Sequence, residues 1–475
     1  MLPQTTGRRR DCLLITIWLA TFVGCFWLVE EFIPHWEFFG PNMLSRKIHS
    51  FVGLALALTI PYWLLLKRKR LDVPVAYAAV LVFLAASLSP TALQTDQIRY
   101  VWDGILTIRG ENPYTLAPAD HPFFTVFPGH QQLNHAQLPT IYPPLAQWIF
   151  GLSTLLNPLL WYGYLGWEWA PIEMPSLGFR LEIGWKIMSG LVAAASLFLL
   201  RARRWDLFFL HPLILITWLG NCHVDLLMCA CLIFLFEGGK RLFHAASALP
   251  AIRESIILSA GILTKGTPLL FVPFFAVRWF RKLRRPAVVW GNIALCCALV
   301  AAPILYYQIT SNGNFFHSPK VFAQNWAFFG YMSGFIGDLG KLLGLGNPFY
   351  WARIAGLSIW IPVSLFLIVL ALHARVSTRL LCFLVYSSFL WFSPTLHPWY
   401  LIGMLYLGLP YIHLFPVIWI WPALALTSHI FYIDRIDPVA LRLGVYAIVT
   451  FFNVQLLQAL WQHRKQFRKA ELSVR

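Results

Sequence analysis

This sequence contains few charged residues. Only 12% of its 475 residues are Asp, Glu, Lys or Arg, whereas 58% are hydrophobic. A soluble domain of this length needs a far more polar surface, so the composition is typical of a polytopic membrane protein. The chain also lacks internal repeats, low-complexity tracts and a separate soluble domain. We therefore expect one transmembrane domain over residues 1–475.

Acidic residues are the rarer of the charged residues: the chain has 20 Asp and Glu but 37 Lys and Arg, which gives a net charge of +17. The basic residues cluster between hydrophobic runs, at 8–10, 67–70, 201–204, 278–285 and 464–469. If alternate loops lie in the cytoplasm, the positive-inside rule accounts for the charge imbalance. This arrangement argues against nucleic-acid binding and predicts that both termini are cytoplasmic.

Cysteine is scarce and unpatterned. Nearly all of the eight cysteines lie in or beside apolar runs, as packing residues do, and their spacing forms neither a disulfide framework nor a metal-binding pattern. Residues 8–10 followed by an apolar run resemble a signal peptide. The run reaches Val29 without a small-residue cleavage site, and a retained signal anchor is therefore expected.

Hydropathy predicts an all-α polytopic membrane protein with about 14 transmembrane helices. The expected spans are 13–33, 48–66, 74–93, 180–200, 206–220, 224–237, 252–265, 267–280, 287–307, 351–372, 378–395, 398–412, 414–432 and 438–461. Two large extracytoplasmic loops follow from this order, at 94–179 and 308–350. The apolar segment 142–160 is not counted, because another crossing would invert every later loop. We expect a helix lying at the membrane interface over 144–156, with proline at its start.

The first loop begins with a second predicted interfacial helix. A helical wheel places on one face the polar side chains Asp96, Arg99, Tyr100, Asp103 and Thr107. The opposite face is apolar and consists of Ile98, Val101, Ile105 and Ile108. This pattern predicts a helix on the membrane surface with its apolar face toward lipid. The alternative is that Asp96 only caps or solvates a helix end.

Three ordered fragments carry a resemblance to a known family. They are Asp96-x-x-Arg99-Tyr100-x-Trp102-Asp103-Gly104, Gly110-x-Asn112-Pro113-Tyr114 and Tyr142-Pro143-Pro144. The set resembles the GT-C superfamily of integral-membrane glycosyltransferases. It looks most like the bacterial branch that uses polyprenol-phosphate-mannose.

The resemblance implies that Asp96 is the catalytic base toward the acceptor. It places Asp103 beside it as a second catalytic acid, or as a residue that orients Arg99 or binds the acceptor. The substrate-binding residues implied in this region are Arg99, Tyr100, Asn112, Tyr114 and Tyr142. The chemistry requires such groups independently, since a carboxylate must accept or orient the hydroxyl proton and cations must stabilise the departing phosphate.

Three further segments join the expected site as substrate-binding residues. His223 and Asp225 occupy an external turn, where they either cap a hairpin or line the cavity near the donor phosphate. Lys265 either snorkels to the interface or binds the donor electrostatically. His397 belongs to a His-Pro-Trp-Tyr run that serves as an aromatic belt or as the entrance for the polyprenyl tail.

The expected function is therefore an inverting hexosyltransferase on the extracytoplasmic face of the bacterial inner membrane. The donor would be a polyprenyl-phosphate sugar, with mannose as the expected sugar. The acceptor would be a lipid, a glycan or a protein. Residues 326–330 depart from the Trp-x-x-Asn feature of the mannose-using relatives, which leaves aminoarabinose or arabinofuranose open. A lipid-linked glycan transporter or flippase is the alternative of another class, although no repeated halves support it. No cofactor is required. A divalent metal is compatible with this chemistry but nothing indicates one.

Overall fold

The computed structural model describes residues 3–32, 43–68, 70–157, 177–201, 203–238, 249–283, 285–374, 376–432 and 439–462. This part of the chain is helical, and its only β-type pairing consists of isolated bridges from Phe328 and Phe329 to Thr395. The expected all-α membrane architecture is thus confirmed at the level of helix content and apolar character. Parts of several predicted features lie outside the described residues, namely 158–176 of the first loop and the basic cluster 464–469.

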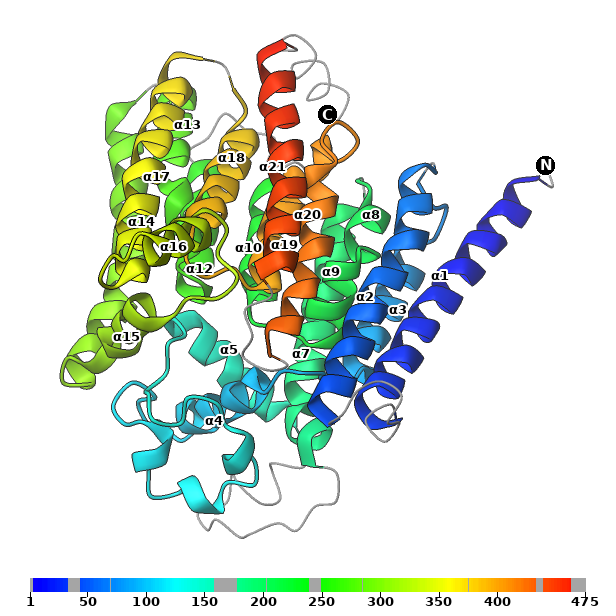
Figure 1. Cartoon of the computed structure of the whole chain (residues 1–475), viewed down its shortest axis with the longest axis horizontal. Helices are drawn as coiled ribbons and strands as arrows, with labels where there is room; N and C mark the ends of the chain where they lie inside the picture. The colour runs from blue at the N-terminus through cyan, green and yellow to red at the C-terminus, as the bar shows by residue number, and fades with distance from the viewer. Residues whose placement is uncertain are drawn as a thin grey trace.

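The N-terminal part of the bundle contains four helices. They are α1 (Pro3–Trp27, continued by the π-helical η1, Leu28–Phe32), α2 (Met43–Leu66), α3 (Val75–Leu88) and α7 (Leu177–Leu200). Helix α3 packs against both α1 and α7. In Figure 1, α1, α2 and α3 form one flank of the molecule.

The rest of the bundle alternates long helices with broken ones. The central helices are α8 (Trp205–Phe209), α9 (Pro212–Ile214), the π-helical η7 (Leu215–Gly220), α10 (Asp225–Glu237), α12 (Leu249–Thr264), α13 (Val272–Lys282) and α14 (Pro286–Thr310). The later ones are α15 (His317–Asn325), α16 (Met332–Leu342), α17 (Pro348–His373), α18 (Thr378–Phe392), α19 (Leu401–Gly408), α20 (Val417–Ala425) and α21 (Val439–Gln462). The second predicted loop therefore contains two helices, α15 and α16.

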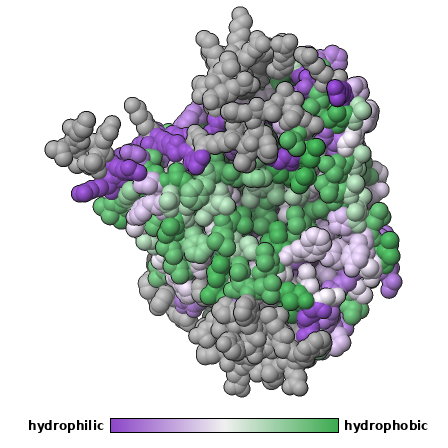
Figure 2. All heavy atoms as spheres, turned by 180° about the vertical axis from the view of Figure 1, so that it is seen from behind, coloured by the Kyte–Doolittle hydropathy of each residue, from purple (hydrophilic) through white to green (hydrophobic). Residues whose placement is uncertain are grey.

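The prediction of fourteen spans does not match this structure. Among the described residues, five helices are long and apolar enough to cross a membrane, and a sixth span results if the bent pair of residues 212–220 and 225–237 counts as one. The hydropathy windows overcounted because several cover broken segments; 206–220, for example, divides into α8, α9 and η7. The apolar belt itself is present, since Figure 2 shows hydrophobic residues across the middle of the molecule and hydrophilic ones toward its ends.

Helices α4 (Asp96–Ile108) and α5 (Pro144–Leu155) lie beneath one end of the bundle and pack against each other (Figure 1). Both occur where the sequence predicts them, and Pro144 stands in the first turn of α5. Their close packing depends on Gly104, because a Cβ there would come within 2.5 Å of the carbonyl oxygen of Phe150. Local periodicity thus located the helices, and a glycine sets their separation.

The expected orientation of α4 is wrong in one respect. Its apolar face does not lie on lipid but is buried under the loop that follows and against Leu181 of α7. This small core consists of Ile98, Val101, Trp102, Ile105, Leu106, Phe127, Leu133, Ala136 and Leu181. An amphipathic face has to be covered by something apolar, and here the chain provides the cover itself.

Candidate functional site

Asp96 is the first residue of α4, and its side chain remains 22% exposed. One carboxylate oxygen lies 3.0 Å from Nε2 of His223, and the other accepts a hydrogen bond from the amide of Asn134. Burial alone would raise the pKa of this carboxyl group, but the hydrogen bonds and the charge of His223, with the Asn134 amide, lower the pKa to about 2. A carboxylate also suits a helix N-terminus. Asp96 is therefore ionised at neutral pH.

Asp96 begins a linear series of four charged or chargeable side chains, which we call the relay: Asp96, His223, Asp225 and Lys265. His223 Nδ1 lies 2.8 Å from Oδ2 of Asp225, and the same oxygen lies 3.0 Å from Nζ of Lys265. Acids and bases alternate along the relay. An imidazolium at position 223 can donate to both carboxylates at once, whereas a neutral ring can donate to only one.

The relay is assembled by a break between two helices. Residues 212–220 and 225–237 are bent by 115° relative to each other, and the turn between them carries His223. Cys222, within this turn, has a φ of 50°, in the left-handed region that residues other than glycine rarely adopt. Lys265 follows α12, which packs against α10 and so faces Asp225. The structure thus brings His223, Asp225 and Lys265, which the sequence predicts as site residues, together with Asp96.

A column of three stacked rings covers one side of His223. Trp399 stacks on His223 at 4.2 Å between ring centroids, His397 stacks on Trp399 at 4.4 Å, and Phe328 stacks on His397 at 4.3 Å. Burial lowers the pKa of His397 to about 3, so this ring is neutral at pH 7. His397 thus contacts Trp399, which in turn stacks on His223 of the relay. Tyr400, from the same segment, places its ring 4.8 Å from Nζ of Lys265.

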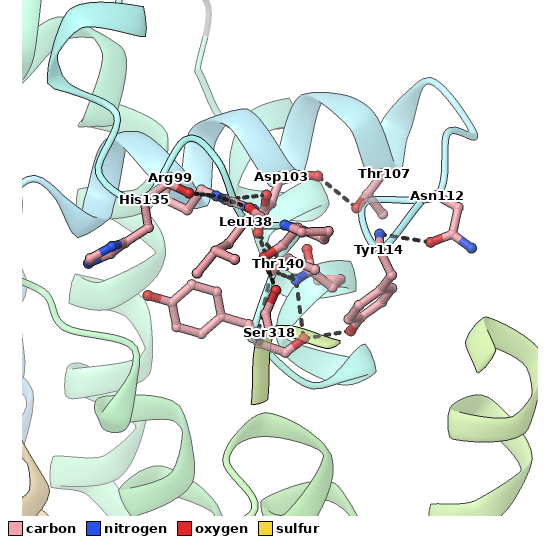
Figure 3. A network of polar contacts seen from close by, with 12 residues as sticks. Arg99, Asp103, Thr107, Asn112, Tyr114, His135, Leu138, Thr140 and Ser318 are labelled. Atoms are coloured by element: carbon pink, nitrogen blue, oxygen red, sulfur yellow. Dashed lines mark hydrogen bonds and ion pairs between the residues drawn. The ribbon is translucent and has the colours of Figure 1, made fainter. Parts of the chain in front are cut away.

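Arg99 and Asp103 form a separate, buried network (Figure 3). Nε of Arg99 lies 2.9 Å from Oδ1 of Asp103, and Nη1 of Arg99 donates to the carbonyl of Leu138 at 3.0 Å. The second oxygen of Asp103 accepts from Thr140 Oγ1 at 2.5 Å and from Gln147 Nε2 at 3.3 Å. Asp103 is fully buried. This geometry corresponds to the expected alternative in which Asp103 orients Arg99.

The tyrosines and the asparagine expected to bind substrate fasten the first loop to its surroundings. The hydroxyl of Tyr114 donates to the carbonyl of Tyr142 at 2.5 Å, and Asn112 accepts from the backbone N–H of Tyr114 at 2.9 Å. The Asn112 amide donates to Thr310 of α14 at 2.8 Å. Tyr100 is buried and stacks on Phe150 of α5. Tyr142, only partly buried, lies edge-on to Tyr100, with ring centroids 5.1 Å apart. Of this group, Tyr100 contacts the relay, with its ring centroid 6.3 Å from that of His223.

Sequence reasoning missed Asn134, which is a direct partner of Asp96. A single asparagine in an irregular loop carries no pattern that could have indicated this role. It also missed Gln97, whose buried amide donates to the carbonyl of Asn221 and ties α4 to the turn before His223. Both contacts join segments far apart in sequence.

Within the described residues, no group of three or more His, Cys, Asp or Glu side chains is arranged to hold a metal ion. Comparison of the chain with protein-family models, with characterised proteins and with solved structures finds no match. The site must therefore be interpreted from its own geometry.

Proposed function

We propose that this protein is a membrane glycosyltransferase that moves a hexose from a polyprenyl-phosphate donor to an acceptor hydroxyl. The observation that carries the proposal is the relay, in which a partly accessible, ionised carboxylate lies in contact with a histidine and is linked through it to a lysine. We place the reaction on the extracytoplasmic face of a bacterial inner membrane, in line with the positive-inside pattern.

In the proposed reaction, the acceptor oxygen attacks the anomeric carbon on the face opposite the phosphate, which inverts that centre. The bond from the anomeric carbon to the phosphate oxygen breaks, and its electron pair stays on the polyprenyl phosphate. The acceptor proton passes to Asp96. A carboxylate with a pKa near 2 is a weak base, so we expect proton transfer late in the reaction, when the attacking hydroxyl has become acidic.

Negative charge develops on the departing phosphate and requires a cation. Lys265 fits this role best, because its side chain is 21% exposed and it is linked to Asp96 through His223 and Asp225. Arg99 is less available, since Asp103 and a backbone carbonyl engage it. Its Nη2 has no hydrogen-bond partner among the described residues and retains two N–H donors.

The proposal is tested by incubating the purified protein with polyprenyl-phosphate mannose, aminoarabinose and arabinofuranose in the presence of membrane extract as acceptor source. Release of polyprenyl phosphate with one of these sugars is expected. Asp96→Asn should reduce this release at least a hundredfold, the scale of a lost general base. The matched control is Asp120→Asn, because Asp120 is an exposed acid in the same loop.

Two results would contradict the proposal. Unchanged sugar transfer by Asp96→Asn would place the base elsewhere. Movement of intact lipid-linked sugar across proteoliposomes, without release of polyprenyl phosphate, would instead support a flippase.

A further inference from the structure

A cavity of about 740 Å³ lies at the end of the bundle opposite Asp96. Helix α10 carries Asp225 at its first residue and Glu237, which lines the cavity, at its last. Twelve helical steps separate these residues by roughly 18 Å. Helix α12 runs alongside, with Arg253 of the cavity near its start and Lys265 just after its end. The cavity and the relay are therefore distinct sites.

The cavity is strongly basic. Its charged lining consists of Arg203, Arg253, Arg278, Arg281, Lys282, Arg379, Glu237 and Glu254. Both acids are already engaged: Glu237 pairs with Arg203 at 3.2 Å and Arg379 at 2.7 Å, and Glu254 pairs with Arg278 at 2.7 Å. Six basic residues against two acids leave an excess of positive charge. Such an excess attracts an anion.

Two guanidinium groups retain donor capacity. Nε of Arg253 and Nε of Arg278 are buried and have no hydrogen-bond partner among the described residues. Nη2 of Arg253 is held by the carbonyl of Phe234 at 2.9 Å, which fixes the orientation of the planar group. A buried donor without a partner is costly unless a ligand satisfies it. Arginine forks match the oxygens of a phosphate group.

The uncharged lining of the cavity is mostly apolar and includes Phe274, Phe275, Ala371 and Val376, with Ser377 and Thr378 as polar members. Ala371 belongs to the last turns of α17, one of the five helices able to cross a membrane. A phosphate attached to hydrocarbon therefore fits the lining better than a free inorganic ion. We propose that this cavity binds the phosphate headgroup of an anionic lipid at the membrane face opposite Asp96.

The test uses the full-length protein in detergent and measures lipid binding by native mass spectrometry. Phosphatidylglycerol, phosphatidylcholine and inorganic phosphate are compared. We expect phosphatidylglycerol to bind best. Arg281→Gln should weaken its binding several-fold and Arg253→Gln by about tenfold, the effect of one charged hydrogen bond. Arg281 is exposed and forms no ion pair within the described residues, so its replacement should leave the fold intact.

The matched control is Lys320→Gln, which removes an exposed positive charge on α15, outside the cavity lining. Three outcomes would overturn the proposal. Equal binding of phosphatidylcholine would remove the need for a net anion. Equal occupancy by inorganic phosphate would show that no lipid is required. Equal loss in Lys320→Gln and Arg281→Gln would show that binding follows overall charge and not this cavity.

Discussion

Asp96 and Asp103 share one helix face, yet the structure gives them different environments, and replacing each with asparagine should separate their roles. Asp103 is fully buried and accepts hydrogen bonds from Arg99, Thr140 and Gln147. Asp103→Asn removes the negative charge and leaves the guanidinium of Arg99 buried. Breaking a buried ion pair in this way costs about 3–5 kcal/mol.

The expected loss for Asp96→Asn is smaller. The pKa of Asp96 is lowered from 3.8 to about 2, which corresponds to at most about 2.5 kcal/mol of favourable interaction at neutral pH. Water reaches this side chain, since it is 22% exposed, and reduces that contribution. Asp96→Asn should therefore lose activity with only a modest loss of stability. In Asp103→Asn the main effect should be the loss of stability.

Unfolding can be followed by tryptophan fluorescence during titration of mixed micelles with sodium dodecyl sulfate, with Asp120→Asn as the control. The double variant Arg99→Met/Asp103→Leu should recover most of the stability, because replacing both members of a buried pair with apolar residues is often nearly neutral. If Asp103→Asn unfolds at the same detergent fraction as Asp120→Asn, the structural role of Asp103 is refuted.

The remaining predictions concern pH, packing and topology. Because the pKa of Asp96 is depressed, its stabilising contribution is present above about pH 4 and is lost as pH falls toward 2. The free energies of unfolding of wild type and Asp96→Asn, measured against pH, should therefore converge between about pH 4 and about pH 2. A constant difference between the two over that range would contradict the prediction. Gly104→Ala should lower the free energy of unfolding by about 1–3 kcal/mol, because the added Cβ pushes α4 away from Phe150. Detergent unfolding measures this loss, with Gly53→Ala as the control, since a Cβ at Gly53 meets nothing within 4 Å. A cysteine at exposed Gln131 should react with an impermeant thiol reagent added to intact cells; reaction only after lysis would invert the proposed topology.

Local sequence patterns located the two helices of the first loop. The alternation of polar and apolar residues over 96–108 has the helical period, and Pro144 favours a helix start, so α4 and α5 could be predicted without any knowledge of their partners. The scarcity of charge predicted the apolar, membrane-type character of the chain, and the described residues are helical. These properties are encoded within a few neighbouring residues.

The number of spans could not be predicted in the same way. Hydropathy averages over a window and does not register a π-helical turn or a bend of 115° within it. It likewise cannot tell an apolar face that meets lipid from one that packs under the protein's own loop, because both environments favour the same side chains.

The site itself was decided by tertiary structure. The sequence identified Asp96, His223, Asp225 and Lys265 as polar residues in unusual places. Their contact depends on how the helices pack, which places His223 3.0 Å from Asp96 although the two residues are 127 positions apart. The same is true of Asn134, which no motif indicated. The energy of an ion pair depends on distance and burial, and both are set by how helices pack, whereas the order of residues along the chain fixes neither.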